Sequence, residues 1–294
     1  ILSKEKIDII KSFGDKKDSK FNENYLHKTF FTSFENNLHQ ALFNLAFQIK
    51  KAIEEENISL IFLDDRCLDE SKKIIPMPLV IGFLNSYLLK HQLRSKVSLI
   101  AISAEAYDSH SCAVCIAFGA SAIYPYLLYS SAIEIAKRNH KDDEHSSKLI
   151  QKKALQNIHK ALNAGLLKIM SKMGICAIDS YQHSSLFDII GLGKDITEDC
   201  FSYAQSFLQG LTYQDIEECI HTNHTKAFEM NQYQNQYELE VGSFYKYKSK
   251  GEYHDYAPAI SLGIRRFASS MQKEDYEMVQ NRINNRGLKM LRDF

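Results

Sequence analysis

The sequence predicts an α/β protein: a partly parallel sheet of βα units, similar to half of a barrel, followed by a mostly helical C-terminal portion. Short runs of consecutive apolar residues end in polar residues and alternate with longer segments in which apolar residues recur every three or four positions. Strands that are apolar throughout and alternate with helices are typical of a parallel sheet covered on both faces. After about residue 196 the helical pattern predominates.

Three strand–helix pairs are expected along the first half of the chain. Pro78 suits the first turn of its helix, because that turn leaves amide hydrogens unpaired and proline has none. Gly119 is placed to close a helix. The expected strands are residues 58–65, 96–103 and 120–125, and the helices that follow them are residues 78–93, 108–119 and 126–138.

The segment NAGLLKIMSKMGICAIDSY, residues 163–181, carries the most specific pattern. Its apolar residues from Leu166 to Met173 recur at helical spacing, so a long helix is expected to end at Gly174 in a left-handed cap. The next four residues, 175–178, are apolar and partly β-branched, and they predict a fourth buried strand.

The chain is expected to divide into three parts. Residues 1–57 form a lead-in with helix and strand, residues 58–195 form the α/β core, and residues 196–294 form a mostly helical extension. The alternation within residues 237–256 predicts an irregular hairpin that interrupts the extension. The first residue is Ile1 and no signal peptide is visible, so a piece of a longer protein is expected.

The composition limits the classes of function. The 36 basic and 36 acidic residues cancel, which argues against nucleic acid or an anionic membrane as a partner. No apolar run approaches the roughly 20 residues that span a bilayer. Six cysteines are scattered through a chain with ample apolar content, so reduced thiols and a cytoplasmic location are expected.

The ends of the expected strands are the places where chemistry is expected, because parallel α/β folds bind ligands at the carboxyl edge of the sheet. The same edge carries polar loops in any such fold, so an ordinary structural role is the alternative. For the two lysines near the end of the long helix, a solvated position that stabilises the helix dipole competes with a contact to another domain. The candidate surface residues are Asp65, Arg66, Glu105, Tyr126, Lys168, Lys172, Ser180 and Tyr181.

One cluster, in HSCAVC, resembles a metal or thiol-redox site. His110, Cys112 and Cys115 have no fourth ligand at a familiar spacing, as a structural zinc site requires. Both cysteines fall in an apolar helix, where a free cysteine commonly serves as a small core residue. Core packing is therefore the preferred interpretation.

Other patterns also favour ordinary explanations. In CIHTNH, Cys219 and His221 lie about 200° apart around a helix, so solvated positions are preferred to a metal site. The aromatic residues and lysines of FYKYKSKGEYHDY resemble a platform for single-stranded nucleic acid, but acidic residues follow at once. No phosphate-binding glycine loop and no nucleophile elbow is present in the sequence. No catalytic, cofactor-binding or metal-binding residue is assigned.

On these residues the chain resembles the central domain of the glutamate synthase large (alpha) subunit. AGLLKIMSKMGICAIDSY is similar to a signature of that family, and the segments from LIFLDDR to GASAIYPYL follow in the same order. YELEVGSFYKYKSKGEYHDYAP is similar to the family's lead into its flavin barrel. The chain departs from the family at QHSSLFDI, where a glycine-containing turn is usual, and at YDSHS, where more histidines are usual.

The resemblance implies a non-catalytic connecting domain between a glutaminase domain and an FMN-barrel domain of one polypeptide, helping to frame the ammonia route between them. It implies that the whole enzyme is an oxidoreductase that makes L-glutamate from L-glutamine and 2-oxoglutarate, with FMN, an iron–sulfur cluster and a small NADPH-oxidising subunit as further components. No cofactor is expected in this chain. The alternative is an autonomous α/β enzyme or ligand-binding module with its pocket at the carboxyl ends of the strands.

Overall fold

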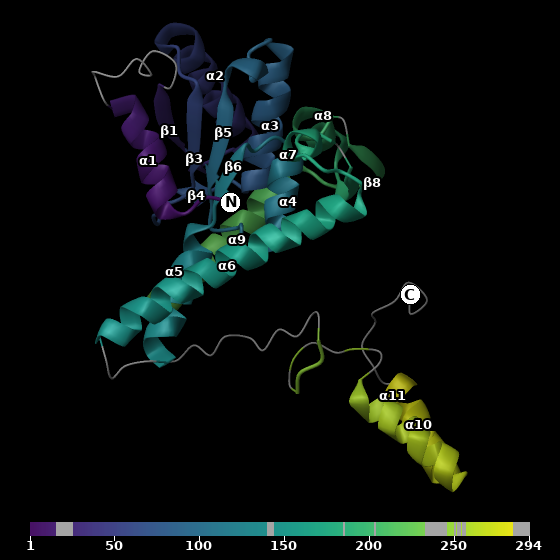
Figure 1. The fold of residues 1–294 in the computed structure, drawn as a ribbon. Coiled ribbons are helices and arrows are strands. Elements are labelled where there is room, and N and C mark those ends of the chain that lie inside the picture. The colour runs from purple at the N-terminus through teal and green to yellow at the C-terminus, as the bar shows by residue number, and fades with distance from the viewer. Residues whose placement is uncertain are drawn as a thin grey trace. The chain divides into compact units, whose positions relative to one another are not determined.

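The computed structural model describes residues 1–15, 26–139, 144–184, 186–202, 204–232, 246–249, 251, 254 and 257–284 (Figure 1). The chain forms two compact units, Ile1–Glu229 and Met230–Phe294. The first unit contains a parallel sheet with helices, and most of the described residues of the second lie in helices. The predicted fold class is confirmed.

The sheet of the first unit has the strand sequence of half a barrel. Its four strands are parallel and lie in the order β1-β3-β5-β6, so each strand pairs with the next one of the sheet along the chain. A helix follows each strand, as in the βα units of a barrel. The strands are β1 (His27–Phe31), β3 (Leu60–Asp64), β5 (Ser98–Ile102) and β6 (Ala122–Tyr124), and the helices are α2 (Leu38–Glu56), α3 (Met77–Lys90), α4 (Ser109–Ala117) and α5 (Tyr126–Asn139).

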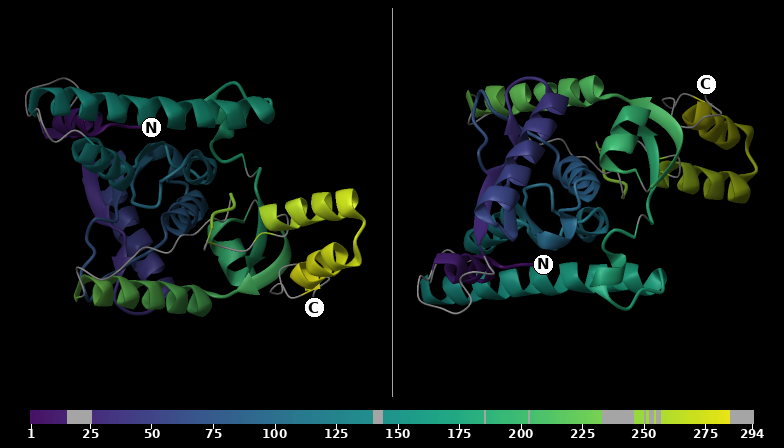
Figure 2. Two further views of the ribbon diagram at one scale, coloured as in Figure 1. Left: turned by 90° about the horizontal axis from the view of Figure 1, so that it is seen from below. Right: turned by 90° about the horizontal axis from the view of Figure 1, so that it is seen from above.

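Alternate residues of the central strands point to opposite faces of the sheet, and both faces are buried. Ile61 and Leu63 pack in a large core with residues of α2, α3 and α4. Phe62 packs in a smaller core on the other face, with residues of α1 (Lys4–Asp15) and of the long helix α6 (Glu144–Lys172). Figure 2 shows α1 and α6 together on one side of the sheet. Continuously apolar strands therefore match a sheet with two dry faces.

The sequence predicts some strand within the lead-in of residues 1–57 but not its bounds, and the structure shows that β1 lies there and extends the main sheet. It pairs in parallel with β3 along its whole length, from His27 opposite Leu60 to Phe31 opposite Asp64. It lies at the edge of the sheet, and Phe31 is exposed. An edge strand with a polar first half lacks the continuous apolar run that marks the inner strands.

The long helix α6 ends at Gly174 as predicted. Gly174 has a φ of 73°, and its amide donates to Ser171 O at 3.2 Å, while the Ile175 amide donates to Met170 O at 2.9 Å. These two bonds form a Schellman motif, in which a left-handed residue lets the chain satisfy the last helical carbonyls.

The predicted fourth strand at residues 175–178 is wrong. The chain there leaves the Schellman motif without strand pairing and enters a short helix, α7 (Ile178–Tyr181). Ile175 packs against the large core, but Cys176, Ala177 and Ile178 are exposed, and no strand pairs with this run among the described residues. A short apolar run does not distinguish strand from helix by itself, and tertiary packing decides between them.

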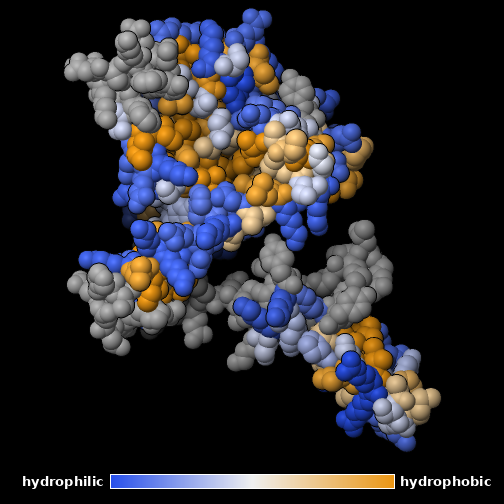
Figure 3. All heavy atoms as spheres, viewed as in Figure 1, coloured by the Kyte–Doolittle hydropathy of each residue, from blue (hydrophilic) through white to orange (hydrophobic). Residues whose placement is uncertain are grey.

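A small parallel sheet that the sequence did not reveal follows. β7 (Asp188–Leu192) and β8 (Gln205–Leu211) pair irregularly around α8 (Lys194–Cys200), and α9 (Tyr213–Gln232) comes next. Ile190, Phe207 and Leu208 on this sheet are exposed. Figure 3 shows apolar side chains gathered over the part of the molecule where α7, α8 and β8 lie.

The second unit contains a helical hairpin of α10 (Pro258–Ser270) and α11 (Lys273–Asn284). Met271 turns the chain with a φ of 53°, and Asp275 accepts a hydrogen bond from the Ser270 hydroxyl and pairs with Arg266 at 2.8 Å. The hairpin predicted for residues 237–256 lies outside the described residues, apart from 246–249, 251 and 254.

Replacing Gly174 by valine is expected to lower the free energy of unfolding by about 1–2 kcal/mol, because an L-residue at positive φ places Cβ against the following carbonyl. No atom lies within 4 Å of the position that a Cβ would occupy, so the backbone conformation alone causes the loss. Denaturant midpoints measure it. Gly174→Asn is the matched control and should lose clearly less, since asparagine tolerates this conformation. Equal midpoints for valine and glycine would contradict the left-handed cap.

Candidate functional site

Four of the predicted surface residues, Asp65, Arg66, Glu105 and Tyr126, lie at the carboxyl edge of the half-barrel. Each of them directly follows β3, β5 or β6 or opens the loop or helix after it. The two-stranded ladder of β2 (Ser33–Phe34) and β4 (Lys73–Ile74) closes the neighbouring loops at the same edge. The parallel arrangement therefore brings these side chains into one region, as the strand order requires.

Arg66 forms a bidentate ion pair with Asp64. Its Nε donates to Oδ1 at 2.8 Å and its Nη2 donates to Oδ2 at 2.6 Å, while the Arg66 amide also donates to Oδ1 at 3.0 Å. Hydrogen bonding to Asp64 raises the pKa of Arg66 above its ordinary value. The guanidinium carbon lies 5.8 Å from the centre of the Tyr126 ring, which is within the range of a cation–π contact.

Asp65 is completely buried beside this pair. Its Oδ2 accepts hydrogen bonds from the Ser103 hydroxyl at 3.0 Å and from the Ala104 amide at 2.8 Å. Among the described residues, no group makes a well-formed hydrogen bond to Oδ1. Burial raises the pKa of Asp65, and the bonds from Ala104 and Ser103 and the nearby Tyr126 hydroxyl only partly offset that rise.

Glu105 connects the loop after β5 to the start of α3. Its Oε2 accepts a hydrogen bond from the Met77 amide at 2.7 Å, and its own amide donates to the Ser103 hydroxyl at 3.1 Å. Desolvation raises the pKa of Glu105, and the negative charge of Asp65 raises it further. The residue as a whole is exposed, but its carboxylate is committed to an amide at a helix N-terminus, where negative charge is favoured.

These contacts join the loops that follow β3 and β5 to one another and to α3. The described part of the chain has no group of three or more His, Cys, Asp or Glu residues arranged to hold a metal ion. The buried carboxylate of Asp65 is closed off from solvent, and its accepted hydrogen bonds come from the protein itself. The geometry supports the fixing of loop positions better than it supports acid–base chemistry on a substrate.

In the wild type, ionisation of Asp65 is expected to lower the free energy of unfolding as pH rises above 4. In Asp65→Asn this decrease should be smaller. The raised pKa of Asp65 means that its stabilising contribution is full below the ordinary value of 3.8 and is lost as pH rises through the folded-state pKa. Asparagine stays neutral and keeps an acceptor oxygen for Ser103 and Ala104. Asp65→Ala removes that acceptor and should cost about 1–3 kcal/mol.

The measurement is the free energy of unfolding across a pH series. Asp69→Asn is the control: hydrogen bonds from Ser71 and Lys72 lower the pKa of Asp69 to about 2, so this variant should alter the pH dependence only in acid. An unchanged slope above pH 4 in Asp65→Asn would show that Asp65 does not titrate in that range.

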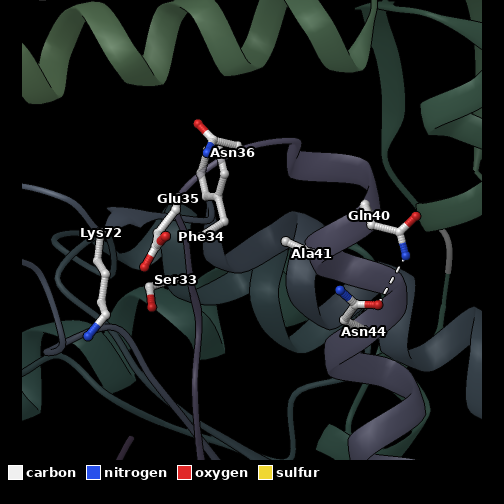
Figure 4. A pocket seen from close by; sticks show the side chains of 8 residues that line it. All are labelled: Ser33, Phe34, Glu35, Asn36, Gln40, Ala41, Asn44 and Lys72. Atoms are coloured by element: carbon white, nitrogen blue, oxygen red, sulfur yellow. Dashed lines mark hydrogen bonds between the residues drawn. The ribbon is translucent and has the colours of Figure 1, made fainter.

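A polar pocket lies beside this region, between the loops that follow β1 and β3 and the first turns of α2 (Figure 4). Its volume is about 390 Å³. In Figure 4 the amide group of Gln40 points to that of Asn44, and the Nε2–Oδ1 distance is 3.0 Å. The pocket is open to solvent, and its lining residues are Ser33, Phe34, Glu35, Asn36, Gln40, Ala41, Asn44 and Lys72.

The start of α2, next to this pocket, is held by a residue that the sequence did not identify. Glu217 of α9 accepts hydrogen bonds from the amides of Asn37 and Leu38 at 3.0 and 2.9 Å. Asn37, with a φ of 57°, caps the same helix by accepting from the Gln40 amide. The carboxylate lies where the helix dipole favours negative charge. A sequence gives no signal for a cap that comes from so far along the chain.

Thr32 is a second residue that the sequence did not indicate. It is completely buried just after β1, and its hydroxyl has no hydrogen-bond partner among the described residues. Its backbone is fully used: the amide donates to Asp64 O at 3.0 Å, and its carbonyl accepts from the Ile75 amide at 3.0 Å. Thr32 therefore connects the ends of β1, β3 and β4 through its main chain.

The other four predicted surface residues lie apart from the edge, on α6 and α7. Lys168, Lys172 and Ser180 are exposed, whereas Tyr181 is completely buried in the large core. The expectation that Ser180 and Tyr181 stand at the exit of a strand is wrong, because the chain is helical there. A contact of the exposed residues with another domain stays a prediction.

Tyr181→Phe is expected to leave the free energy of unfolding unchanged or to raise it. The Tyr181 hydroxyl is buried without a hydrogen-bond partner among the described residues, so its removal relieves a desolvated polar group. Tyr181→Ala is the matched variant and should cost about 3–5 kcal/mol, because it leaves a cavity. Chemical denaturation measures both. A large loss in Tyr181→Phe would show that the hydroxyl has a partner in the folded chain.

The cysteines of HSCAVC are core residues, as the sequence favoured. Cys112 and Cys115 are buried free thiols in α4. Burial raises the pKa of Cys112 to about 11 and that of Cys115 further. Neutral thiols of this kind are poor nucleophiles and poor metal ligands. His110 packs edge-on against Phe187, with ring centres 6.1 Å apart.

The second histidine cluster lies on α9, as predicted from its helical context. Cys219 and His221 are exposed, and His224 Nε2 lies 3.1 Å from Glu70 O. The lysines of the expected aromatic–lysine strand, Lys246 and Lys248, are exposed where the structure describes them. Within the described helices, none is long and apolar enough to cross a membrane.

The fold and its edge define an α/β half-barrel domain whose polar loops are fixed largely by its own groups. The model of the glutamate synthase central domain family matches residues 1–193. The chain therefore belongs to the glutamate synthase central domain family. This confirms the resemblance that the sequence motifs indicated.

Individual relatives agree with the family match. A glutamate synthase (NADPH) large chain of Bacillus subtilis is 32% identical over 247 residues, covering 83% of this chain and 15% of that protein. Ferredoxin-dependent glutamate synthase 1 of Arabidopsis thaliana is 30% identical over 266 residues, covering 88% of this chain and 16% of that protein. Ferredoxin-dependent glutamate synthase 2 of Synechocystis is 32% identical over 284 residues, covering 88% of this chain and 17% of that protein. The chain thus spans less than a fifth of the length of these relatives.

Proposed function

We propose that this chain is the non-catalytic connecting domain of a glutamate synthase and that it helps to frame the route of ammonia between a glutaminase domain and an FMN-barrel domain of the same polypeptide. The match of residues 1–193 to the central domain family carries this proposal. The relatives are several times longer than this chain, which leaves room for further domains in such a polypeptide.

The geometry of the carboxyl edge supports a structural role. In barrel enzymes this edge carries the catalytic groups. Here Asp64 is neutralised by Arg66, Asp65 is enclosed, and Glu105 caps α3. Groups committed in this way fix the loops in place, and fixed loops suit a surface that holds neighbouring domains in register.

The activity proposed for the whole polypeptide is the formation of L-glutamate from L-glutamine and 2-oxoglutarate. FMN and an iron–sulfur cluster are proposed to belong to the other domains, and a small NADPH-oxidising subunit is a further proposed partner. The relatives are named for NADPH in one case and for ferredoxin in others, so the names alone do not choose the electron donor.

The competing proposal is an autonomous α/β enzyme or ligand-binding module. It has the polar pocket beside α2 in its favour, since that pocket lies at the edge where such folds bind ligands. The genomic sequence around the coding region separates the two proposals. A glutaminase upstream and a flavin barrel downstream support a connecting domain, whereas a start codon just before Ile1 and a stop codon after Phe294 contradict it.

In the full-length polypeptide, Arg66→Ala and Lys172→Ala are expected to uncouple the two half-reactions. Each removes an exposed cation from one of two separate surfaces proposed to face other domains, and Arg66→Ala also removes the ion-pair partner of the buried Asp64. Glutamine hydrolysis and glutamate formation are measured separately, and hydrolysis should exceed glutamate formation in these variants. Lys51→Ala is the control, because Lys51 is exposed on α2 and pairs only weakly with Glu55 at 3.7 Å. Unchanged coupling in both test variants would contradict a domain-contact role for these two residues.

A further inference from the structure

Arg94 is a buried cation that lies just after α3, at the start of a short 3-10 turn (Arg94–Lys96). Its guanidinium donates to three acceptors: Nε to Asn85 Oδ1 at 2.9 Å, Nη1 to Val97 O at 2.8 Å, and Nη2 to Gly119 O at 2.7 Å. All three acceptors are neutral. The hydrogen bonds hold the guanidinium in one place, but they do not cancel its charge.

No acidic side chain of the described residues forms an ion pair with Arg94. Burial lowers the pKa of Arg94 to about 10, and no neighbouring carboxylate raises it again. Buried charges in proteins are normally paired, because the cost of removing an ion from water is large. An uncompensated buried guanidinium therefore calls for a negative group that the described part of the chain does not supply.

A pocket of about 350 Å³ lies beside Arg94. Asn85 connects the two, because its side-chain oxygen accepts from Arg94 while the residue also lines the pocket. Most of the other lining side chains are apolar, among them Leu89, Phe118 and Phe201. The polar lining residues are Asn85, Ser86, His183 and Ser202.

His183 lies at the rim of this pocket and responds to the same charge. Its backbone is held by a bond from its amide to Ala117 O at 2.9 Å, and its φ is 63°. Desolvation, together with the smaller effect of the positive charge of Arg94, lowers the pKa of His183 to about 4. The His183 imidazole is therefore neutral at neutral pH. A bound anion would offset the charge of Arg94 and would make protonation of His183 easier.

We propose that this pocket binds a small organic monocarboxylate with an apolar body. The carboxylate faces the side of the pocket formed by Asn85 and His183, where it offsets the charge of Arg94. The apolar body packs against Leu89, Phe118 and Phe201. Such a ligand would supply a negative charge for Arg94, which lies on the far side of Asn85 from the pocket. The proposal does not depend on the connecting role proposed for the domain.

The charge of Arg94 disfavours the other simple ligand classes. An amine would add a second positive charge near Arg94 and is disfavoured. A neutral amide of the same shape would bury the same apolar area but would not offset the cation. A dicarboxylate would place its second charge against the apolar wall, where ionised groups are costly to bury.

Hexanoate, hexanamide and hexylamine are the probes, titrated against the whole chain by calorimetry and by NMR of the histidine rings. Hexanoate is expected to bind about tenfold or more tightly than hexanamide, and hexylamine is expected not to bind. Hexanoate should also raise the pKa of His183, whereas hexanamide should leave it unchanged. Equal binding of hexanoate and hexanamide, or no saturable binding of hexanoate, would overturn the proposal.

Two variants locate the site. Leu89→Trp fills the rim of the pocket and should weaken hexanoate binding about tenfold or more. Leu127→Trp adds the same side chain at an exposed position on α5 that does not line the pocket, and it should bind hexanoate as the wild type does. Binding that survives Leu89→Trp, or that is lost equally in both variants, would place the ligand elsewhere.

Arg94→Met tests the role of the charge directly. In a folded variant the preference for hexanoate over hexanamide should disappear, because the cation that the carboxylate offsets is gone. A preference that persists in that variant would overturn the proposal. If the variant does not fold, the comparison of the Leu89 and Leu127 variants decides.

Discussion

A parallel sheet has to bury both of its faces, and the architecture of the first unit follows from that constraint. In a complete barrel the strands close around their own inner face. The four strands here cannot close, so Phe62, Ile100 and Ile102 would face water without another element against them. Helices α1 and α6 supply that cover, and they come from opposite ends of the sheet's part of the chain. The outer face is covered by the helices that connect the strands, as in any βα repeat.

The same constraint accounts for the way in which the polar edge is arranged. Loops that leave a two-sided sheet carry polar groups into a region with little solvent, and each group needs a partner. Asp65 takes its partners from the loop after β5, and Glu105 takes an amide from α3. The loops are therefore fixed to one another by the groups that would be available for chemistry in an enzyme of this fold class. Asp65 Oδ1 and the Thr32 hydroxyl are left unpaired in the described residues.

The inner strands were predictable because their apolar runs are continuous, and the helices between them because their spacing is regular. The bounds of β1 were not predicted, since HKTFF begins with polar residues at the edge of the sheet. The apolar run at residues 175–178 predicts a strand that the structure does not contain, because apolar character over four residues does not separate strand from helix. Asp65 and Glu105 lie in one region because strand order brings the residues that follow parallel strands together. The contacts of Arg94 and Glu217 could not be predicted. Arg94 donates to two backbone carbonyls and to the Asn85 side chain, Glu217 accepts from two backbone amides, and no sequence pattern marks such contacts.

The hydrogen bonds that Glu217 accepts from the start of α2 also affect the order in which the chain folds during synthesis. It holds the first turn of α2 from a position 180 residues further along the chain. During synthesis at about 5–20 residues per second, α2 therefore emerges many seconds before its cap exists. Until α9 leaves the ribosome, the first helix of the half-barrel depends on Asn37 alone for its capping side chain. The half-barrel can thus collapse early. The N-terminus of α2 gains its second cap only when nearly all of residues 1–229 have been synthesised.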